Sequence, residues 1–380
     1  MSSSKRAANG AGTVRERKDG TWEARYTGAD GRQHSIYAKT RPEAKAKLKK
    51  KMAELTLGLW VEPSTVTVEA WVNTWLKEYV GQRKHGTQQS YTSIMKTHIL
   101  PEFGNIKLYK LNTGIIKRGF GRISAKGLAP STIKSIKIAF SSCLTAAVEC
   151  KIIKENPCRS ISTQRVPKRK LVFIDRKDYP AFLSEVRKHR YSVAILLLFQ
   201  TGLRSGEMRG LRWSDFNPET SELTVSRQII ETDKGPVVQT TKDDEERTII
   251  LTQDTVNLLK RHKKQQAETR MKYGPWKDTP ETEDLIFRNR DGSIYKQSRL
   301  YYTVQKIGKA INIPGLHPHS LRDSYAIAAL RAGVDVKTVS NNLGHADTAM
   351  TLNKYIGYTD DMGRVAAERY AKYLRENSTN

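Results

Sequence analysis

The chain has 380 residues and a formal net charge of +27 at pH 7, and its length allows two or three domains. A positive charge of this size is typical of a protein that binds a polyanion, and it argues against an ordinary enzyme of small-molecule metabolism. The apolar run Val193–Phe199 is much shorter than the roughly 18 residues of a membrane span, and the polar start has no signal-peptide core. We therefore expect a cytoplasmic protein whose main partner is nucleic acid.

The positive charge is spread over the whole chain. Residues 1–60 contain 14 Lys and Arg against 6 Asp and Glu, and residues 66–165 contain 16 against 5. Residues 166–380 contain 36 against 27. A generic basic surface is the alternative explanation, but this distribution favours phosphate contacts in every section.

Residues 1–60 are predicted to form the first domain, a small sheet with one helix. The predicted strands are Thr13–Arg17, Trp22–Thr27 and Gln33–Ala38. Asp-Gly pairs between them favour hairpin turns, and a Lys-rich helix is predicted over Pro42–Leu57. We expect one sheet face to enter a DNA groove with four arginines, namely Arg15, Arg17, Arg25 and Arg32. The alternative is a packing module in which Trp22 and Tyr26 are simply core.

Residues 64–163 are predicted to form the second domain, which is helical throughout. Apolar residues at i, i+3 and i+4 spacing predict four helices, and Pro101 is predicted to end the second of them near Leu100. The apolar stripes are expected to form the core. The opposite faces carry lysines that suit phosphate contacts along a duplex, namely Lys84, Lys96, Lys134 and Lys137.

A basic linker leads into the third predicted domain, residues 168–380, and its Lys168 and Arg169 are expected to lie along a phosphate backbone. This domain mixes helices with short strands. Two predicted strands, Val237–Lys242 and Arg247–Leu251, are joined by a charged turn, so we expect a hairpin with Lys242 at its tip.

Short motifs of the third domain carry residues that suit phosphate chemistry. Arg204 opens a short helix after a glycine break in TGLRSGE. The sequence HSLR places His319 and Arg322 at i and i+3, on one face of a helix. His345 follows in LGH, and Tyr355 comes ten residues later. Each motif alone is a weak signal, since a His–Arg pair on a helix is more often part of a solvated face.

Taken together and in this order, these residues resemble the tyrosine recombinase (phage integrase) family. The resemblance covers most of the third domain and implies a multidomain, mainly α fold with small β elements. Its parts would be an arm-type DNA-binding domain with a three-stranded sheet plus helix, a helical SAM-like core-binding domain and a mixed α+β catalytic domain. The chain departs from the family at Asp323-Ser324, where His-Thr is frequent, and at Gly357, where many members have histidine.

The resemblance implies a site-specific DNA recombinase, an integrase of a temperate phage or conjugative transposon. Such an enzyme cleaves and rejoins strands through a covalent 3′-phosphotyrosine, and it integrates and excises a mobile element. Tyr355 would be the nucleophile, His319 the general base and Lys242 the general acid.

The phosphate would be held by the remaining motif residues. Arg204 and Arg322 would clamp it, because the guanidinium fork matches two oxygens and stays charged. His345 would hydrogen-bond the phosphate, and Glu207 would be a structural partner that supports the site.

No metal, cofactor or ATP is expected, because two arginines and a lysine supply the positive charge that a metal ion would otherwise bring. Cys143, Cys150 and Cys158 lack the spacing of a metal site. Two alternatives remain open: a type IB topoisomerase, which shares the phosphotyrosine chemistry, and a non-catalytic DNA-binding regulator on a recombinase fold.

The expected partners follow from the same resemblance. They are double-stranded DNA with core and arm attachment sites, an excisionase, a host DNA-bending protein and further copies of the chain. Family members pass a C-terminal helix, predicted here over Asp360–Glu376, to a neighbour in a homotetramer. Tyr358 is a second candidate nucleophile, but Gly357 before it is expected to leave it loosely held, so Tyr355 is preferred.

Overall fold

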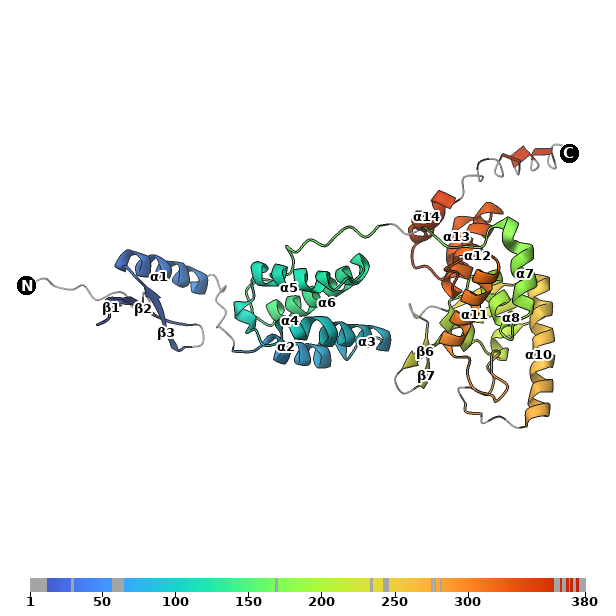
Figure 1. Cartoon of the computed structure of the whole chain (residues 1–380), viewed down its shortest axis with the longest axis horizontal. Coiled ribbons are helices and arrows are strands. Elements are labelled where there is room, and N and C mark those ends of the chain that lie inside the picture. The colour runs from blue at the N-terminus through green and yellow to red at the C-terminus, as the bar shows by residue number, and fades with distance from the viewer. Residues whose placement is uncertain are drawn as a thin grey trace, which may run out of the picture. The chain divides into compact units, whose positions relative to one another are not determined.

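The computed structural model describes residues 12–28, 31–56, 65–167, 170–232, 235–241, 246–274, 276, 278–280 and 282–358, with scattered positions from 363 to 375. The chain divides into two compact units, Met1–Lys168 and Arg169–Asn380 (Figure 1). The first unit contains two hydrophobic cores, one in each of the first two predicted domains. Within the described part, no helix is long and apolar enough to cross a membrane.

The first unit begins with an antiparallel sheet of order β1-β2-β3, formed by Thr13–Glu16, Trp22–Thr27 and Gln33–Ala38. Helix α1 (Arg41–Thr56) covers one face of it (Figure 1). Tyr26 of β2 is buried in the small core that also contains Leu48 of α1. Because side chains alternate along a strand, the neighbours of Tyr26 point to the opposite face. The three strands and the helix predicted from the sequence are confirmed.

The helical part of the first unit follows. Its elements are α2 (Val68–Trp75), η1 (Leu76–Val80), α3 (His85–Ile94), η2 (Met95–Ile99), α4 (Leu100–Phe103), η3 (Leu108–Lys110), α5 (Thr113–Ala125) and α6 (Pro130–Glu149). Asn112 caps α5 by accepting a 3.0 Å hydrogen bond from the backbone N–H of Ile115. The apolar stripes predicted from the sequence meet in one core, in which Trp75, Phe103 and Phe140 are fully buried.

The prediction that Pro101 ends the second helix is wrong. The helical run continues through it from His85 to Phe103. The reason is the π-helical stretch Met95–Ile99, in which the N–H of Leu100 bonds to the carbonyl of Met95. This wider turn changes the bonding register just before the proline, so Pro101 occupies the first turn of α4, where its missing N–H costs no hydrogen bond.

The second unit is built around α8 (Ser192–Thr201), a short helix made almost entirely of apolar residues. Its neighbours include α7 (Tyr179–Arg187), α10 (Gln253–Tyr273) and α12 (Pro318–Arg331) (Figure 1). The other named helices between residues 170 and 358 are η4 (Arg176–Asp178), α9 (Ser205–Gly210), η5 (Trp213–Asp215), α11 (Gln297–Ala310), α13 (Val336–Leu343), α14 (Thr348–Tyr355) and η6 (Ile356–Tyr358). Residues 320–324 of α12 are buried, including Arg322 and Asp323, whereas His319 is exposed.

The strands of the second unit pair differently from the prediction. β4 (Phe216–Asn217), β5 (Glu222–Val225) and β8 (Arg247–Ile250) form one sheet, and β6 (Arg227–Thr232) pairs with β7 (Gly235–Thr240). The predicted hairpin between β7 and β8 is therefore wrong. β8 pairs instead with β5, because Ile249 opposite Leu223 is buried in the core. Lys242, predicted at the hairpin tip, lies outside the described residues.

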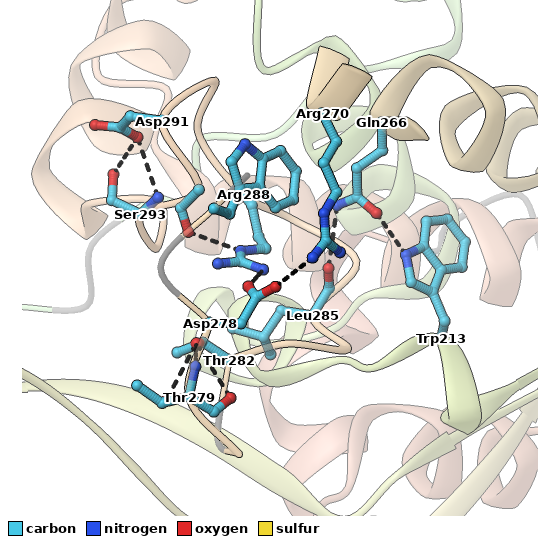
Figure 2. A network of polar contacts seen from close by, with 12 residues as sticks. Trp213, Gln266, Arg270, Asp278, Thr279, Thr282, Leu285, Arg288, Asp291 and Ser293 are labelled. Atoms are coloured by element: carbon cyan, nitrogen blue, oxygen red, sulfur yellow. Dashed lines mark hydrogen bonds and ion pairs between the residues drawn. The ribbon is translucent and has the colours of Figure 1, made fainter. Parts of the chain in front are cut away.

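The loop between α10 and α11 contains a network of hydrogen bonds and ion pairs (Figure 2). Arg288 is buried, donates to the carbonyl of Gly292 at 2.7 Å and forms an ion pair with Asp278. Arg270 of α10 pairs with the same carboxylate at 2.7 Å, and the indole of Trp213 donates to Gln266 of α10 at 2.7 Å. The Arg270–Asp278 pair therefore ties the loop to α10, and the Trp213–Gln266 bond ties η5 to the same helix.

Candidate active site

Arg204 is positioned by the break between α8 and α9. Gly202 ends α8 with a φ of +70°, and a Cβ there would lie 2.4 Å from the ring of Tyr325, so a residue with a side chain does not fit. Arg204 then precedes α9, and its guanidinium donates to Glu207 at 2.8 Å and to the carbonyl of Gly344 at 2.9 Å. Its side chain remains 25% exposed.

Glu207 joins two arginines. It is fully buried and accepts hydrogen bonds from Arg204 and, at 2.6 Å, from Arg247 of β8. Burial by itself raises the pKa of Glu207, but the hydrogen bond and charge of Arg247, together with Arg204, outweigh it and lower the pKa below its usual value. Glu207 is therefore an anion at neutral pH, and its role as a supporting residue, predicted from the sequence, fits this position.

Arg322 lies almost fully buried in α12. It donates to the carbonyl of Gly202 at 2.8 Å and to that of Leu343 at 2.5 Å. These carbonyls belong to the C-terminal ends of α8 and α13, where the helix dipole favours a cation. Burial, and then the charge of Arg204, lower the pKa of Arg322 to about 10, so it stays charged at neutral pH. Its Nε is buried with no hydrogen-bond partner in the described part of the chain.

His345 follows the same turn. Gly344 ends α13 with a φ of +60°, and a Cβ there would lie 2.8 Å from Arg247. The Nδ1 of His345 is 2.8 Å from the hydroxyl of Thr351 in α14. Burial, followed by the charges of Arg322 and Arg204, lowers the pKa of His345 to about 4. The ring is therefore neutral at physiological pH and can donate one hydrogen bond to an anion.

Tyr355 ends α14 and is fully buried. Its hydroxyl donates a 2.7 Å hydrogen bond to Oδ1 of Asp323. The ammonium of Lys354 lies 2.6 Å from the same oxygen. Burial raises the pKa of Tyr355 well above its ordinary value, and Asp323 raises it further. The phenol is therefore neutral in this arrangement.

His319 is on the same helix as Arg322, as predicted. Its Nε2 accepts a 3.2 Å hydrogen bond from the ammonium of Lys354. Lys354 also contacts Asp323, which binds the hydroxyl of Tyr355, so His319 and Tyr355 are connected through these two residues. His319 as a whole residue is exposed, but the protein packed around its ring lowers its pKa, opposed by the charge of Asp323. A neutral ring with an accepting nitrogen has the form that a general base requires.

A cleft of about 330 Å³ adjoins Arg204 and His345, whereas Arg322, His319 and Tyr355 are not among the residues that line it. It is lined by Arg204, Thr241, Glu246, Arg247, Thr248, Asn341, Gly344 and His345. Thr241 and Glu246 stand on either side of the segment that contains Lys242. The cleft therefore has two arginines and a neutral imidazole on its walls, which suits a tetrahedral anion such as a phosphodiester.

Tyr358 lies elsewhere. Its hydroxyl accepts a 2.9 Å hydrogen bond from the backbone N–H of Leu171, and its ring packs edge-on against Phe173. Arg331 also donates to its carbonyl at 2.9 Å. The expectation that Gly357 leaves Tyr358 loosely held is wrong, since these contacts fix it, but they fix it away from the cleft.

Two of the four arginines predicted to bind DNA in the first domain, Arg15 and Arg25, share one sheet face. The strand register places Arg15 opposite Glu23 and Arg25 opposite Ser35, on the face away from α1. Arg15 and Arg25 lie 2.7 Å and 3.1 Å from the carboxylate of Glu23. A hydrogen bond from Ser35, and then those from Arg25 and Arg15, lower the pKa of Glu23 to about 2.

The remaining two arginines of this domain lie nearby on the chain. Arg17 follows β1, with its guanidinium 5.2 Å from the ring centre of the exposed Tyr37, and Arg32 is exposed just before β3. The aromatic residues Trp22 and Tyr26 lie on the helix side, as the core alternative expects. The sheet thus has an apolar face against α1 and an arginine-rich face that is open.

The predicted lysines of the second domain are distributed less evenly. Lys134 and Lys137 of α6 line a groove of about 540 Å³ together with Arg83, which sequence reasoning missed. Lys84 and Lys96 are exposed but do not line this groove. Lys168 and Arg169 lie outside the described residues.

Sequence reasoning also missed Arg247, Lys354 and Asp323. Arg247 begins a strand and Lys354 precedes the candidate nucleophile, so neither has a local pattern that singles it out. Asp323 did carry a signal, since it stands directly after Arg322 where the resembled family often has histidine. Its contact with Tyr355 depends on the packing of α14 against the start of α12.

Comparisons with known proteins show which family the chain resembles over its length. Residues 162–361 match the phage integrase family, and residues 67–119 match the N-terminal SAM-like domain of phage integrases. A tyrosine recombinase XerC-like protein of Caldanaerobacter subterraneus subsp. tengcongensis is 30% identical over 343 residues, or 84% of this chain and 86% of that protein. The integrase of Mycobacterium phage L5 is 24% identical over 97% of this chain and 99% of its own length.

One solved structure extends the comparison to the fold. The Tn1549 transposon integrase in complex with transposon right end DNA matches with a TM-score of 0.69 and 22% sequence identity. The match covers 80% of this chain and 100% of that chain. At this identity the likeness concerns the fold alone.

Proposed function

Since this chain belongs to the phage integrase family and is a site-specific DNA recombinase, we propose that its cleft binds the scissile phosphate and that Tyr355 attacks it. The product of this attack is a covalent 3′-phosphotyrosine, which keeps the energy of the phosphodiester. The strand can then be rejoined to a new partner, so the element is integrated or excised. A topoisomerase or a non-catalytic regulator is not favoured by the family match.

One observation carries this assignment. Arg204 and Arg322 come from distant parts of the sequence, yet they donate to the consecutive carbonyls of Gly344 and Leu343, directly before His345. Three groups that can hold an anionic phosphate are therefore anchored on one turn. Tyr355 ends the next helix, and its hydroxyl contacts Asp323, which is adjacent to Arg322. In such a preorganised site, loss of one donor costs roughly 10²–10³ in rate.

The proposed reaction assigns every proton. The oxygen of Tyr355 forms a bond to phosphorus while the bond from phosphorus to the 5′ oxygen breaks. His319 accepts the phenol proton, and Lys242 supplies one to the 5′ oxygen. Arg204 and Arg322 neutralise the non-bridging oxygens, and His345 donates to one of them. Because these side chains supply the positive charge themselves, we propose that neither a metal ion nor ATP takes part.

A suicide substrate tests this function. A duplex core site with a nick next to the scissile phosphate releases a short strand after cleavage, so the adduct accumulates and is seen by denaturing electrophoresis. We expect a covalent adduct in EDTA without nucleotide, and none with Tyr355→Phe, whose DNA binding should be unchanged. Tyr358→Phe is the matched control and should form the adduct. The reverse result would move the nucleophile to Tyr358.

The DNA-binding roles of the other parts are proposals of the same kind. We propose that residues 1–60 bind arm sites through the open sheet face of Arg15 and Arg25, with Arg17 and Arg32 next to the strands, and that residues 64–163 bind the core site. Lys134 and Lys137 support the second part, because they share a groove with Arg83. Lys84, Lys96, Lys168 and Arg169 are proposed as further phosphate contacts.

The assembly is proposed from the family. Four copies would bind two paired sites, and each would pass the segment 360–376 to a neighbour. Most of that segment lies outside the described residues. An excisionase and a host DNA-bending protein would set the direction of the reaction, which would take place on the bacterial nucleoid.

A further inference from the structure

The nucleophile is held in a buried position by its polar neighbours. The side chain of Tyr355 is fully buried, and its hydroxyl donates to Asp323 at 2.7 Å. The same carboxylate oxygen is 2.6 Å from Lys354, which in turn is 3.2 Å from His319. A phenol oxygen that attacks a DNA phosphate has to meet that phosphate directly, so this buried arrangement precedes the reacting one.

The charges around the phenol oppose its ionisation. Asp323 is 3% exposed and faces the phenol oxygen from α12, so a phenolate would lie beside a buried carboxylate. Arg322 of α12 and Lys354 of α14 act in the opposite sense. His319 and His345 are two further titratable groups near these charges, and Arg204, Glu207 and Arg247 lie near Arg322. Among these groups, only Asp323 both contacts the phenol and favours its neutral form.

We propose that Asp323 is a positioning residue that holds Tyr355 in a protonated resting state. Lys354 weakens this effect of Asp323 on the phenol, because its ammonium neutralises the carboxylate. The inference rests on the proposed function, because it assumes that Tyr355 is the nucleophile. Before attack, the hydrogen bond between Tyr355 and Asp323 breaks and α14 presents the phenol to the phosphate. His319 then accepts the phenol proton, as in the proposed reaction.

Two substitutions of opposite effect test the proposal. In the full-length protein, single-turnover adduct formation on the nicked substrate is measured with saturating enzyme between about pH 5.5 and 9.5. Asp323→Asn removes the negative charge and should move the pH profile to lower pH by about 1–3 units. Lys354→Met leaves the carboxylate unopposed and should move the profile to higher pH. A purely structural role for Asp323 would lower the amount of active enzyme without moving the profile.

A double variant keeps the test decisive if Asp323→Asn alone fails to fold. Asp323→Asn combined with Lys354→Met leaves no unpaired charge, and its profile should lie at lower pH than that of Lys354→Met alone. Glu185→Gln, which alters a surface pair with Lys188, is the control and should not change the profile.

Two outcomes would overturn the proposal. The first is an unchanged profile when Asp323 is replaced in either background. The second is loss of adduct at every pH while the variant still binds DNA, because Asp323 would then be the proton acceptor that attack requires. These two outcomes can be distinguished from a failure of the proposed function. If Tyr355 is not the nucleophile, the Tyr355→Phe variant will still form the adduct.

Discussion

Replacing Glu207 by Gln tests whether one buried carboxylate organises the cleft. Glu207 is fully buried and lies 2.8 Å from Arg204 and 2.6 Å from Arg247. Glutamine has the same shape but no charge, so two arginines lose their counter-ion. Removing one member of a buried ion pair costs about 3–5 kcal/mol of unfolding free energy. For a unit of this size that corresponds to roughly 10 °C in melting temperature.

The cost should depend on pH in a defined direction. The pKa of Glu207 is lower in the folded protein than its ordinary value of 4.5. Its stabilisation is therefore fully present above the unfolded pKa and is lost as the pH falls through the folded one. The difference in stability between wild type and Glu207→Gln should be constant from about pH 8 to 5.5 and should shrink below about pH 4.5.

Calorimetry of the full-length protein measures the melting temperature, and the nicked-substrate assay measures the rate of adduct formation. We expect that rate to fall by about 10²–10³, because Arg204 loses the partner that orients it. Glu185→Gln serves as the control and should change neither quantity. A Glu207→Gln variant with wild-type stability would refute the argument for a buried charge pair. A variant that is less stable but cleaves normally would show that Arg204 is oriented without Glu207.

Four further predictions concern other parts of the chain. Deleting residues 1–60 should leave cleavage of core sites intact and abolish efficient integration, and a truncated protein that integrates normally would disprove the arm assignment. Replacing Glu23 by Gln frees Arg15 and Arg25, so arm-site selectivity should fall while the salt dependence of non-specific binding becomes steeper in filter-binding titrations. Gly344→Ala places a methyl group 2.8 Å from Arg247 and should slow adduct formation more than it weakens DNA binding. Truncation at Asp360 should weaken cooperative assembly on DNA in gel-shift experiments, and unchanged assembly would argue against helix exchange.

The sequence by itself located most helices and strands of this protein and suggested the residues of its candidate site. Periodic apolar residues located the helices of the second domain, and Asp-Gly turns located the sheet of the first, because both patterns arise within a few residues. The motif residues Arg204, His319, Arg322, His345 and Tyr355 were identified from their order along the chain. All five lie within residues 162–361, the part of the chain that matches the phage integrase family.

The tertiary structure decided which of these segments meet. β8 pairs with β5 and not with β7, because burial of Ile249 outweighs the short connection that the sequence pattern favoured. Pro101 lies within a helical run because the π-helical turn before it has already changed the hydrogen-bond register. The pairing across the sheet outweighed the short β7–β8 connection, and the π-helical hydrogen bond outweighed the tendency of proline to end a helix.

The same reason explains the contacts that were missed at the site. Glu207 joins Arg204 to Arg247, and Asp323 binds the hydroxyl of Tyr355, although these partners are far apart in sequence. Such buried polar contacts form only where two helices, or a helix and a strand, pack against each other. Local residue patterns do not predict which elements pack together, because the packing of their apolar faces brings the polar groups into contact.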